Sequence, residues 1–309
     1  MTDAASRTSP KIGFIGLGAM GSRMAARLLD AGYALSVYNR TMERAGPLTQ
    51  RGAIMMRTPG LLAGASDVVL SCLTDDHALE GVMSGSDGVL ASARPGTIVV
   101  EMSTVLPRTS RLLFEEARAK GVSFLDAPVS GSTPQAEQGQ LVIFVGGSEE
   151  AYTTCRPLFG VLGKEAIYMG ASGSGTATKL CVNALLGVGV QALAEALALG
   201  RKAGLEYERF LRALGETAVL SPAQKSKLVN AGSDRYPAMF PVSLMAKDFS
   251  LIMSEAMRLS VPMPATSAAA QILAAERARQ TESRTDEDFS AVIRTMQQLA
   301  GAIRAGRDA

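Results

Sequence analysis

The chain has 309 residues, of which 47% are apolar and 19% charged, a composition typical of globular proteins large enough for two domains. Its net charge of +2 argues against the strongly basic surface that nucleic-acid binding requires. The three cysteines, Cys72, Cys155 and Cys181, are scattered without metal-type spacing, so we expect reduced thiols, no metal site and a cytoplasmic location. Residues 1–10 are polar and lack the apolar core of a signal peptide.

The first half of the chain alternates apolar, strand-like runs with helix-like segments such as Arg108–Lys120. The strand-like runs are Ile12–Ile15, Leu35–Tyr38, Val68–Leu73, Ile98–Glu101, Ser123–Ala127 and Leu141–Val145. This alternation is typical of a doubly wound, mostly parallel sheet. We therefore predict an α/β protein with an N-terminal Rossmann-type domain over residues 11–172.

The strand pattern ends after Gly175. Residues 176–203 contain no proline and are apolar nearly all round, which predicts a long buried helix. Its most apolar part, Ala184–Leu199, is interrupted by Gln191 and Glu195, and we expect it to fall short of a membrane span. We predict an all-α domain over residues 173–304, joined to the first by this helix, which also contacts another subunit in a homodimer or homotetramer.

The run Gly16-Leu17-Gly18-Ala19-Met20-Gly21 follows the first strand and precedes a helix predicted over 22–31. Glycines at these three spacings allow a tight turn, a close backbone approach to a pyrophosphate, and close packing of helix on strand. A purely structural turn is the alternative. The return to a second apolar strand about twenty residues on favours a dinucleotide site.

The end of that second strand indicates which dinucleotide is bound. Sites for NAD usually have Asp or Glu here to bind the ribose 2′-hydroxyl, whereas this chain has Asn39, Arg40 and Thr41. Arg40 can form charge-assisted bonds to a 2′-phosphate, and Asn39 and Thr41 can add neutral ones. We therefore predict NADP(H) as the cofactor, with an ordinary surface role for Arg40 as the alternative.

Few side chains are suited to acid–base chemistry. The single histidine, His77, has no nucleophile motif near it, which argues against a hydrolase. Lys179 is the best candidate proton donor, because it lies near the start of the long helix with Asn183 four residues on, on the same face. A solvated first helical turn with an ordinary lysine is the alternative.

A third cluster, residues 126–141, follows a strand and is rich in small hydroxyl residues, glycine and proline. Such a loop offers backbone N–H groups and the Ser130 hydroxyl to an anionic group. It is therefore a candidate site for an anionic ligand.

These motifs together resemble the β-hydroxyacid dehydrogenases, the family of 3-hydroxyisobutyrate dehydrogenase, tartronate semialdehyde reductase and glyoxylate/succinic semialdehyde reductase. The resemblance runs from Lys11 to about Gly301, with the motifs in the family's order and spacing. One departure lies in the carboxylate loop, where many family members have glycine and this chain has Ser132 and Gln135.

The resemblance implies roles for individual residues. Lys179 matches the general acid/base, Asn183 the residue that orients the substrate, and Ser103-Thr104 the pair beside the nicotinamide ribose. With the positions argued above, the expected cofactor contacts are Gly16, Leu17, Gly18, Ala19, Met20, Gly21, Asn39, Arg40, Thr41, Leu73, Thr74, Thr104 and Lys247. The expected substrate contacts are Ser130, Gly131, Ser132, Phe240 and Asp248.

The implied activity is an NADP(H)-dependent interconversion of a small β-hydroxyacid and its semialdehyde or 2-oxoacid, without nucleic-acid or membrane partners. Two alternatives belong to other classes: an imine reductase-like enzyme and a non-catalytic NADP-binding scaffold protein. Both types of relative lack the lysine, so Lys179 disfavours them. A methyltransferase is disfavoured by Arg40, where an acidic ribose ligand is expected.

Overall fold

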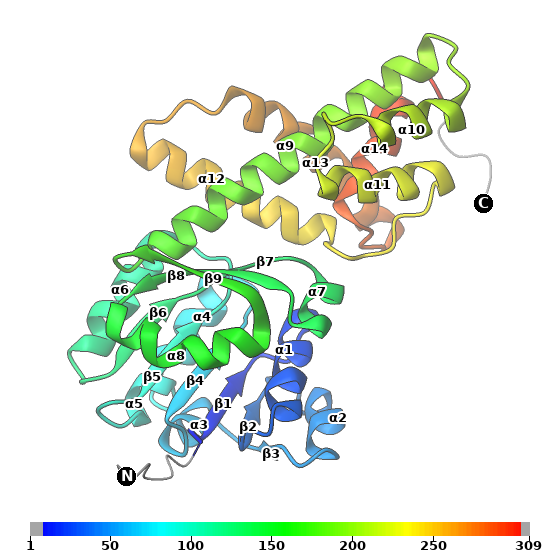
Figure 1. The fold of residues 1–309 in the computed structure, drawn as a ribbon. Coiled ribbons are helices and arrows are strands. Elements are labelled where there is room, and N and C mark those ends of the chain that lie inside the picture. The colour runs from blue at the N-terminus through cyan, green and yellow to red at the C-terminus, as the bar shows by residue number, and fades with distance from the viewer. Residues whose placement is uncertain (1–8, 304–309) are drawn as a thin grey trace, which may run out of the picture. The chain divides into compact units, whose positions relative to one another are not determined.

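The structure, a computed structural model, describes residues 9–303. The predicted end of the second domain at residue 304, and most of the polar stretch 1–10, lie outside the described residues. The chain divides into two compact units, one ending at Lys179 and the other beginning at Leu180 (Figure 1). This division falls later in the chain than the boundary predicted at residue 172.

The first unit is an α/β domain, and the α/β fold predicted from the sequence is confirmed. Within residues 9–303 its strands are β1 (Ile12–Ile15), β2 (Leu35–Tyr38), β3 (Ile54–Met55), β4 (Val68–Ser71), β5 (Ile98–Glu101), β6 (Ser123–Asp126), β7 (Val129–Ser130), β8 (Leu141–Gly147) and β9 (Gly163–Gly170). Its helices are α1 (Ala19–Asp30), η1 (Met42–Ala45), α2 (Gly46–Thr49), α3 (Pro59–Gly64), α4 (Asp76–Met83), α5 (Val89–Ser92), α6 (Pro107–Arg118), α7 (Thr133–Gln138) and α8 (Glu149–Leu162).

The strands form one sheet in the order β3-β2-β1-β4-β5-β6-β8-β7, with β9 pairing β8. From β3 to β6 along the sheet, each strand runs parallel to its neighbour. Strand β8 runs antiparallel to both β6 and β7. All residues of β1, β4 and β5 are buried, as expected for strands covered on both faces. The carboxyl ends of these central strands meet at one edge of the sheet, where α/β proteins bind their ligands.

Three strands were not predicted from the sequence. β3 and β7 have two residues each, and β9 alternates exposed side chains such as Ile167 and Met169 with half-buried ones. Short or half-exposed strands carry little apolar signal, which is why the sequence pattern missed them. The predicted 126–141 loop therefore contains β7 and α7.

The long helix α9 (Ser174–Lys202) has 29 residues and confirms the predicted long helix. By length and composition alone it could cross a membrane, contrary to the prediction made from Ala184–Leu199, because the apolar stretch is longer than that segment. In its most apolar stretch of 18 residues, half of the stretch is buried inside the structure. Leu185 and Leu199 remain 78% and 72% exposed, so the helix is not covered all round.

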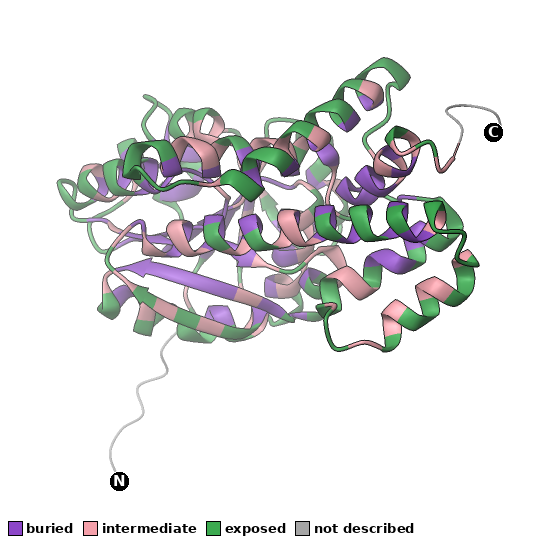
Figure 2. Cartoon of the chain, turned by 90° about the horizontal axis from the view of Figure 1, so that it is seen from above, coloured by how far each residue is buried: buried purple, intermediate pink, exposed green. Residues whose placement is uncertain are grey.

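The second unit is all-α within the described residues. Besides most of α9, it comprises α10 (Tyr207–Glu216), α11 (Pro222–Ser233), α12 (Val242–Leu259), α13 (Pro264–Ser283), η2 (Phe289–Ala291) and α14 (Val292–Leu299). Prolines mark three of the helix starts: Pro222 and Pro264 occupy first helical positions, and Pro241 directly precedes α12. Figure 2 shows how these helices turn buried residues inward and exposed residues outward.

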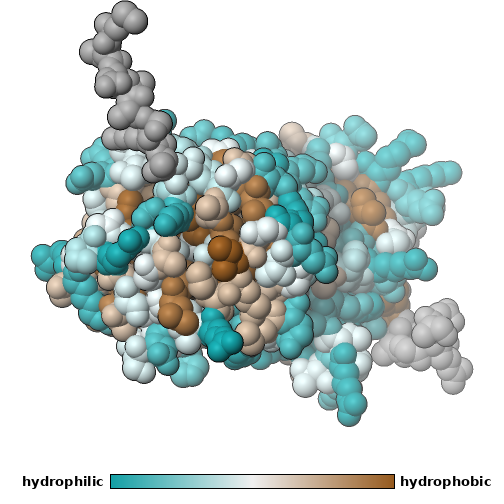
Figure 3. All heavy atoms as spheres, turned by 90° about the horizontal axis from the view of Figure 1, so that it is seen from below, coloured by the Kyte–Doolittle hydropathy of each residue, from teal (hydrophilic) through white to brown (hydrophobic). Residues whose placement is uncertain are grey.

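The surface carries scattered apolar side chains. On the face drawn in Figure 3, hydrophobic residues form small groups between hydrophilic ones. In the first unit the exposed apolar side chains include Ile54, Leu61 and Leu112. Isolated groups of this kind are ordinary for a protein surface.

Candidate functional site

The glycine-rich turn between β1 and α1 needs glycine for two different reasons. Gly16 has a φ of +93°, and a Cβ there would lie 2.2 Å from the Cys72 carbonyl oxygen. A Cβ on Gly21 would lie 1.9 Å from the Gly16 carbonyl oxygen, so only glycine lets α1 pack this closely. At Gly18, by contrast, an added Cβ would meet nothing within 4 Å. The turn therefore leaves open space in front of its middle glycine.

The start of α1 is suited to an anion. Gly18 is the N-cap residue, no side chain caps the helix, and no acidic residue lies in the first turn. The N–H groups of this turn, which includes Ala19 and Met20, therefore remain available, and the helix dipole favours negative charge there. These residues fit the pyrophosphate of a dinucleotide.

Asn39 joins the glycine-rich turn to the end of β2. Its Oδ1 accepts a hydrogen bond from the Leu17 N–H at 2.9 Å, and its Nδ2 donates to the Thr41 carbonyl at 2.7 Å. Its amide is thus engaged within the protein. Arg40 is exposed and forms no hydrogen bond or ion pair with the rest of the described chain.

The loops after β4 and β5 are held together beside the glycine-rich turn. The Leu73 N–H donates to Ser103 Oγ at 2.7 Å. The Leu73 side chain lies close to Gly16, since one of its methyl groups would be 3.0 Å from a Cβ added to that glycine. Thr74 and Thr104 follow these anchored positions along the chain. The expected cofactor segments of the first unit therefore gather at the carboxyl ends of β1, β4 and β5.

A buried carboxyl group, Glu101, braces these loops, and sequence reasoning did not single it out. Glu101 Oε1 accepts from the Ser103 N–H at 2.6 Å, and Oε2 accepts from the Ser71 hydroxyl. Burial raises the pKa of Glu101 to about 7, the bonds from Ser103 and Ser71 lower it, and the neighbouring Asp126 adds a small rise. An acidic residue ending an apolar strand was the available sequence signal.

Asp126, at the end of β6, caps the start of α9. Its Oδ1 accepts from the Gly173 N–H at 2.7 Å, and its Oδ2 accepts from the Thr176 N–H at 2.9 Å. Burial raises the pKa of Asp126, and these hydrogen bonds oppose the rise. The first turns of α9 are therefore fastened to the sheet, which explains why the first compact unit extends to Lys179.

The predicted substrate loop is locally ordered. Gly131 has a φ of +131°, and a Cβ there would lie 2.9 Å from a methyl of Leu141. Ser132 is the N-cap of α7, and its N–H and hydroxyl donate to Gln135 Oε1 at 3.0 and 2.8 Å. The two residues that depart from the family pattern thus cap a helix. Ser130 precedes them as the last residue of β7.

Lys179 and Asn183 lie one turn apart on the same face of α9 and are 8% and 0% exposed. Within the second unit, Asn183 Nδ2 donates to Asp248 Oδ2 at 2.6 Å, and Lys247 Nζ lies 3.0 Å from Asp248 Oδ1. Asn183 Oδ1 is buried and has no hydrogen-bond partner in the described residues. A buried acceptor of this kind is costly to leave unpaired, which indicates a ligand.

Phe240 is fixed by a second buried carboxylate, Asp288. The Phe240 N–H donates to Asp288 Oδ2 at 3.0 Å, and Lys227 Nζ donates to the same oxygen at 2.9 Å. The Phe240 ring packs edge-on against Phe289, with 5.5 Å between ring centroids. Neither Asp288 nor Lys227 was anticipated, because their contacts join distant segments of the chain.

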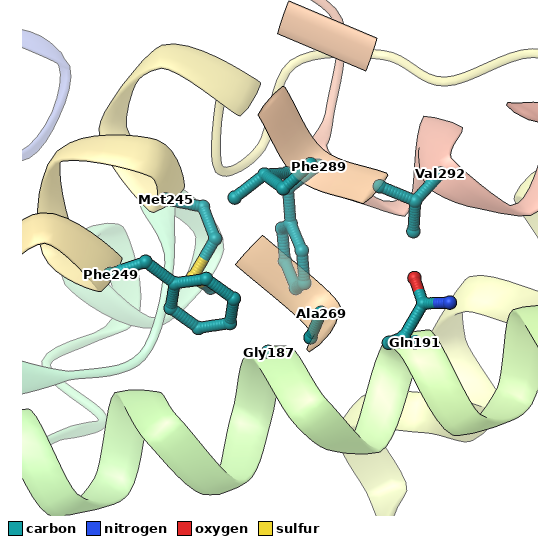
Figure 4. Close-up of a pocket in the computed structure, with 8 residues that line it drawn as sticks. Gly187, Gln191, Met245, Phe249, Ala269, Phe289 and Val292 are labelled. Carbon is teal, nitrogen blue, oxygen red and sulfur yellow. The ribbon is translucent and has the colours of Figure 1, made fainter. Parts of the chain in front are cut away.

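A small cavity in the second unit lies between α9, α12, α13, η2 and the start of α14 (Figure 4). It is lined by Gly187, Gln191, Met245, Phe249, Ala269, Leu273, Phe289 and Val292. A Cβ on Gly187 would lie 2.4 Å from the Phe249 ring, so this glycine serves packing. Apart from Gln191, whose buried Oε1 has no hydrogen-bond partner in the described residues, the lining is apolar and belongs to the core of this unit.

These features define a two-domain, dinucleotide-dependent oxidoreductase. Residues 11–170 match the family described as the NAD binding domain of 6-phosphogluconate dehydrogenase. Residues 173–296 match the family described as NAD-binding of NADP-dependent 3-hydroxyisobutyrate dehydrogenase. The chain belongs to the β-hydroxyacid dehydrogenase family, and it is an enzyme of the dehydrogenase and reductase type.

Named relatives cover nearly the whole chain. It is 36% identical to 2-(hydroxymethyl)glutarate dehydrogenase of Eubacterium barkeri, over 96% of this chain and 98% of the relative. It is 35% identical to glyoxylate/succinic semialdehyde reductase 1 of Arabidopsis thaliana, over 92% and 97%. It is 37% identical to NAD-dependent L-serine dehydrogenase of Pseudomonas aeruginosa, over 91% and 96%.

Solved structures agree with this assignment. The 3-hydroxyisobutyrate dehydrogenase of Mycobacterium tuberculosis, solved with L-serine, is 30% identical with a TM-score of 0.83, covering 94% of this chain and 100% of that one. An imine reductase from Pseudomonas sp. is more distant, at 25% identity and a TM-score of 0.60, covering 94% and 100%.

The contrast between Gly18 and Gly21 gives a matched test of the dinucleotide turn. Gly18→Ala should leave the melting temperature nearly unchanged, because its Cβ meets nothing, yet weaken dinucleotide binding by roughly tenfold or more by occupying the pyrophosphate space. Gly21→Ala should instead lower the melting temperature, because its Cβ meets backbone. Calorimetry and fluorescence titration measure both effects. Unchanged binding in Gly18→Ala would contradict the proposed approach of the pyrophosphate.

Proposed function

We propose that the protein is an NADP(H)-dependent oxidoreductase that interconverts a small β-hydroxyacid and its semialdehyde or 2-oxoacid, working chiefly as a reductase. The substrate belongs to the class of 3-hydroxyisobutyrate, tartronate semialdehyde, succinic semialdehyde and glyoxylate. The pairing of buried Lys179 with Asn183 on α9 is the observation that carries this proposal.

Lys179 acts as the proton donor in the direction of reduction. When bound, the dinucleotide supplies the hydride. The Lys179 ammonium gives its proton to the substrate's carbonyl oxygen, and because negative charge develops there, it stabilises the transition state more than the ground state. Asn183 orients the reacting end of the ligand: Asp248 fixes its Nδ2, which leaves Oδ1 to accept a hydrogen bond from the hydroxyl of the hydroxyacid.

The substrate carboxylate binds to the loop after β7. Ser130 offers its hydroxyl, and Gly131, which must be glycine at a φ of +131°, lets the loop present backbone N–H groups. The Ser132 hydroxyl already donates to Gln135. In substrate binding it therefore either accepts a hydrogen bond or stabilises the conformation of the loop.

The names of the relatives support a β-hydroxyacid. 2-(Hydroxymethyl)glutarate, L-serine and 3-hydroxyisobutyrate all carry a hydroxymethyl group on the carbon that bears a carboxylate. A substrate with this arrangement is held at its carboxylate and reacts at the primary alcohol or the derived aldehyde.

The choice of NADP(H) rests on residues 39–41. No carboxylate is present there to bind a 2′-hydroxyl or repel a 2′-phosphate, and Arg40 is exposed without a partner among residues 9–303. Because the Asn39 amide is engaged by Leu17 and Thr41, the arginine carries most of the proposed selectivity.

An imine reductase is the second candidate, favoured by the structural likeness to the Pseudomonas enzyme. The buried Lys179 fits a carbonyl substrate better, because its ammonium can donate to the carbonyl oxygen, while the unpartnered Asn183 Oδ1 accepts from the hydroxyl of the reduced product. The two functions are separated by measuring the oxidation of NADPH with a panel of short aldehydo-acids, glyoxylate and cyclic imines. A β-hydroxyacid dehydrogenase should reduce the aldehydo-acids or glyoxylate, whereas an imine reductase should reduce the cyclic imines. Failure of every member to be reduced would leave a non-catalytic scaffold as the remaining function.

The location and assembly belong to the same proposal. Cys72, Cys155 and Cys181 form no disulfide in the described residues, and burial raises the pKa of Cys155 to about 12, which keeps it unreactive. Reduced cysteines support a cytoplasmic enzyme. Exposed Leu185 and Leu199 on α9 support contact with a second copy of the chain.

Assembly is tested by light scattering. We expect a mass of two or four chains at micromolar concentration, because large apolar side chains on α9 gain free energy when covered. Leu185→Glu should shift the mass toward one chain, whereas Glu165→Gln on the other unit should not. A monomeric parent protein would contradict the homodimer or homotetramer.

Arg40→Ala tests cofactor selection. Loss of one charge-assisted interaction with the 2′-phosphate is worth roughly 1.5–3 kcal/mol, so the KM for NADPH should rise about ten- to a hundredfold. The KM for NADH should stay nearly constant. Arg118→Ala, at an exposed pair with Glu115, serves as the control. Equal use of NADH and NADPH by the parent enzyme would refute NADP(H) selectivity.

Lys179→Ala tests the proton donor. It should lower kcat by roughly 10²- to 10⁴-fold, the usual range for a positioned acid, while NADPH affinity stays within a few-fold. Asn183→Ala should lower kcat by a smaller factor, because this residue orients the substrate and does not supply the proton. The parent rate of reduction should fall at high pH as the lysine loses its proton, and the variant should lack this dependence. Retention of most turnover would show that α9 does not carry the acid.

A further inference from the structure

Glu101 occupies a central position at the edge of the sheet where the dinucleotide segments gather. It is fully buried at the end of β5, between the ends of β4 and β6. Its carboxyl oxygens accept from Ser71 and from the Ser103 N–H, and Ser103 Oγ in turn accepts from the Leu73 N–H. One carboxyl group thus orders both of these loops, which are expected to contact the cofactor, and Ser103 belongs to the pair expected beside the nicotinamide ribose.

The charge of Glu101 is not balanced by a cation. Its hydrogen-bond donors are neutral, and no lysine, arginine or histidine forms an ion pair with it within residues 9–303. From β4 it faces Ser71, and from β6 it faces Asp126, which is itself acidic. Burial and Asp126 raise the pKa of Glu101 to about 7, so its charged and neutral forms are both populated near neutral pH.

The two redox forms of a nicotinamide differ in charge, because the oxidised ring carries a positive charge and the reduced ring is neutral. In doubly wound sheets the ligand lies at the carboxyl ends of the strands. A buried charge at that edge is poorly screened, so it discriminates between the two rings.

We infer that Glu101 links proton binding to the redox state of the bound dinucleotide, its ionised carboxylate favouring the oxidised form over the reduced form. This inference rests on the proposed dinucleotide-dependent function. Glu101 is a positioning residue, since it touches Ser71 and Ser103, and its charge adds a preference between cofactor forms.

The direction of the effect follows from the charge. As pH rises through about 7, Glu101 ionises and the affinity for NADP⁺ rises relative to that for NADPH. By reciprocity, NADP⁺ binding lowers the pKa of Glu101 and releases protons, whereas NADPH binding releases fewer. The 2′-phosphate is common to both forms, so its titration cancels in the comparison.

The test is the ratio of dissociation constants for NADP⁺ and NADPH at pH 6 and pH 8, measured by calorimetry without substrate. We expect the ratio to fall by about three- to tenfold from pH 6 to pH 8, the size expected for one partly screened charge. Glu101→Gln keeps the geometry, because its oxygen accepts from Ser103 and its amide donates to Ser71. This variant should show a constant ratio, whereas Glu165→Gln, at an exposed site on β9, should behave like the parent.

A constant ratio in the parent, or an unchanged pH dependence in Glu101→Gln, would overturn the inference. If Glu101→Gln does not fold, proton release by the parent decides, measured from calorimetry in buffers of different ionisation enthalpy. More protons released with NADP⁺ than with NADPH supports the link, and equal release refutes it. If NAD⁺ and NADH are the cofactors bound, the same ratio is measured with that pair. Because no substrate is present, absence of reductase activity would leave this test valid.

Discussion

The bond between the Asp126 carboxylate and the first turn of α9 is the constraint on which the candidate site depends. Each carboxylate oxygen accepts a backbone N–H, from Gly173 and from Thr176, that would otherwise be an unsatisfied donor at a buried helix start. A Cβ on Gly175 would lie 2.3 Å from the Phe144 carbonyl, so glycine allows the close approach. The start of the helix that carries Lys179 is thereby part of the sheet domain.

Glu101 and Asp126 end neighbouring strands and are both buried. No lysine, arginine or histidine in the described residues forms an ion pair with either of them. Burying two neighbouring carboxyl groups in a low-dielectric interior therefore lowers the stability of the fold. Each is offset by hydrogen bonds that hold a different part of the site: Glu101 the loops after β4 and β5, and Asp126 the start of α9. The buried carboxyl groups thus lower stability at the strand ends, but their hydrogen bonds fix the segments that form the candidate site.

Local patterns in the sequence predicted the sheet domain well. Apolar runs and glycine spacing identified β1, the turn and α1, because these signals arise from neighbouring residues. The pairs that build the site were not predictable in this way: Ser71 is 30 residues from Glu101, and Asn183 is 65 from Asp248. The contacts expected for Lys179 and Ser130 remain predictions, since they concern a ligand.

Asn39 has a consequence for how this chain could change its dinucleotide during evolution or engineering. An aspartate at this position would still accept the Leu17 N–H, but its second oxygen would face the Thr41 carbonyl, an acceptor where the amide now donates. The simplest acidic replacement therefore sets two acceptors against each other and strains the connection to the glycine-rich turn. An acidic ligand for the ribose would therefore disturb this connection less at the neighbouring position, or together with a reshaped turn.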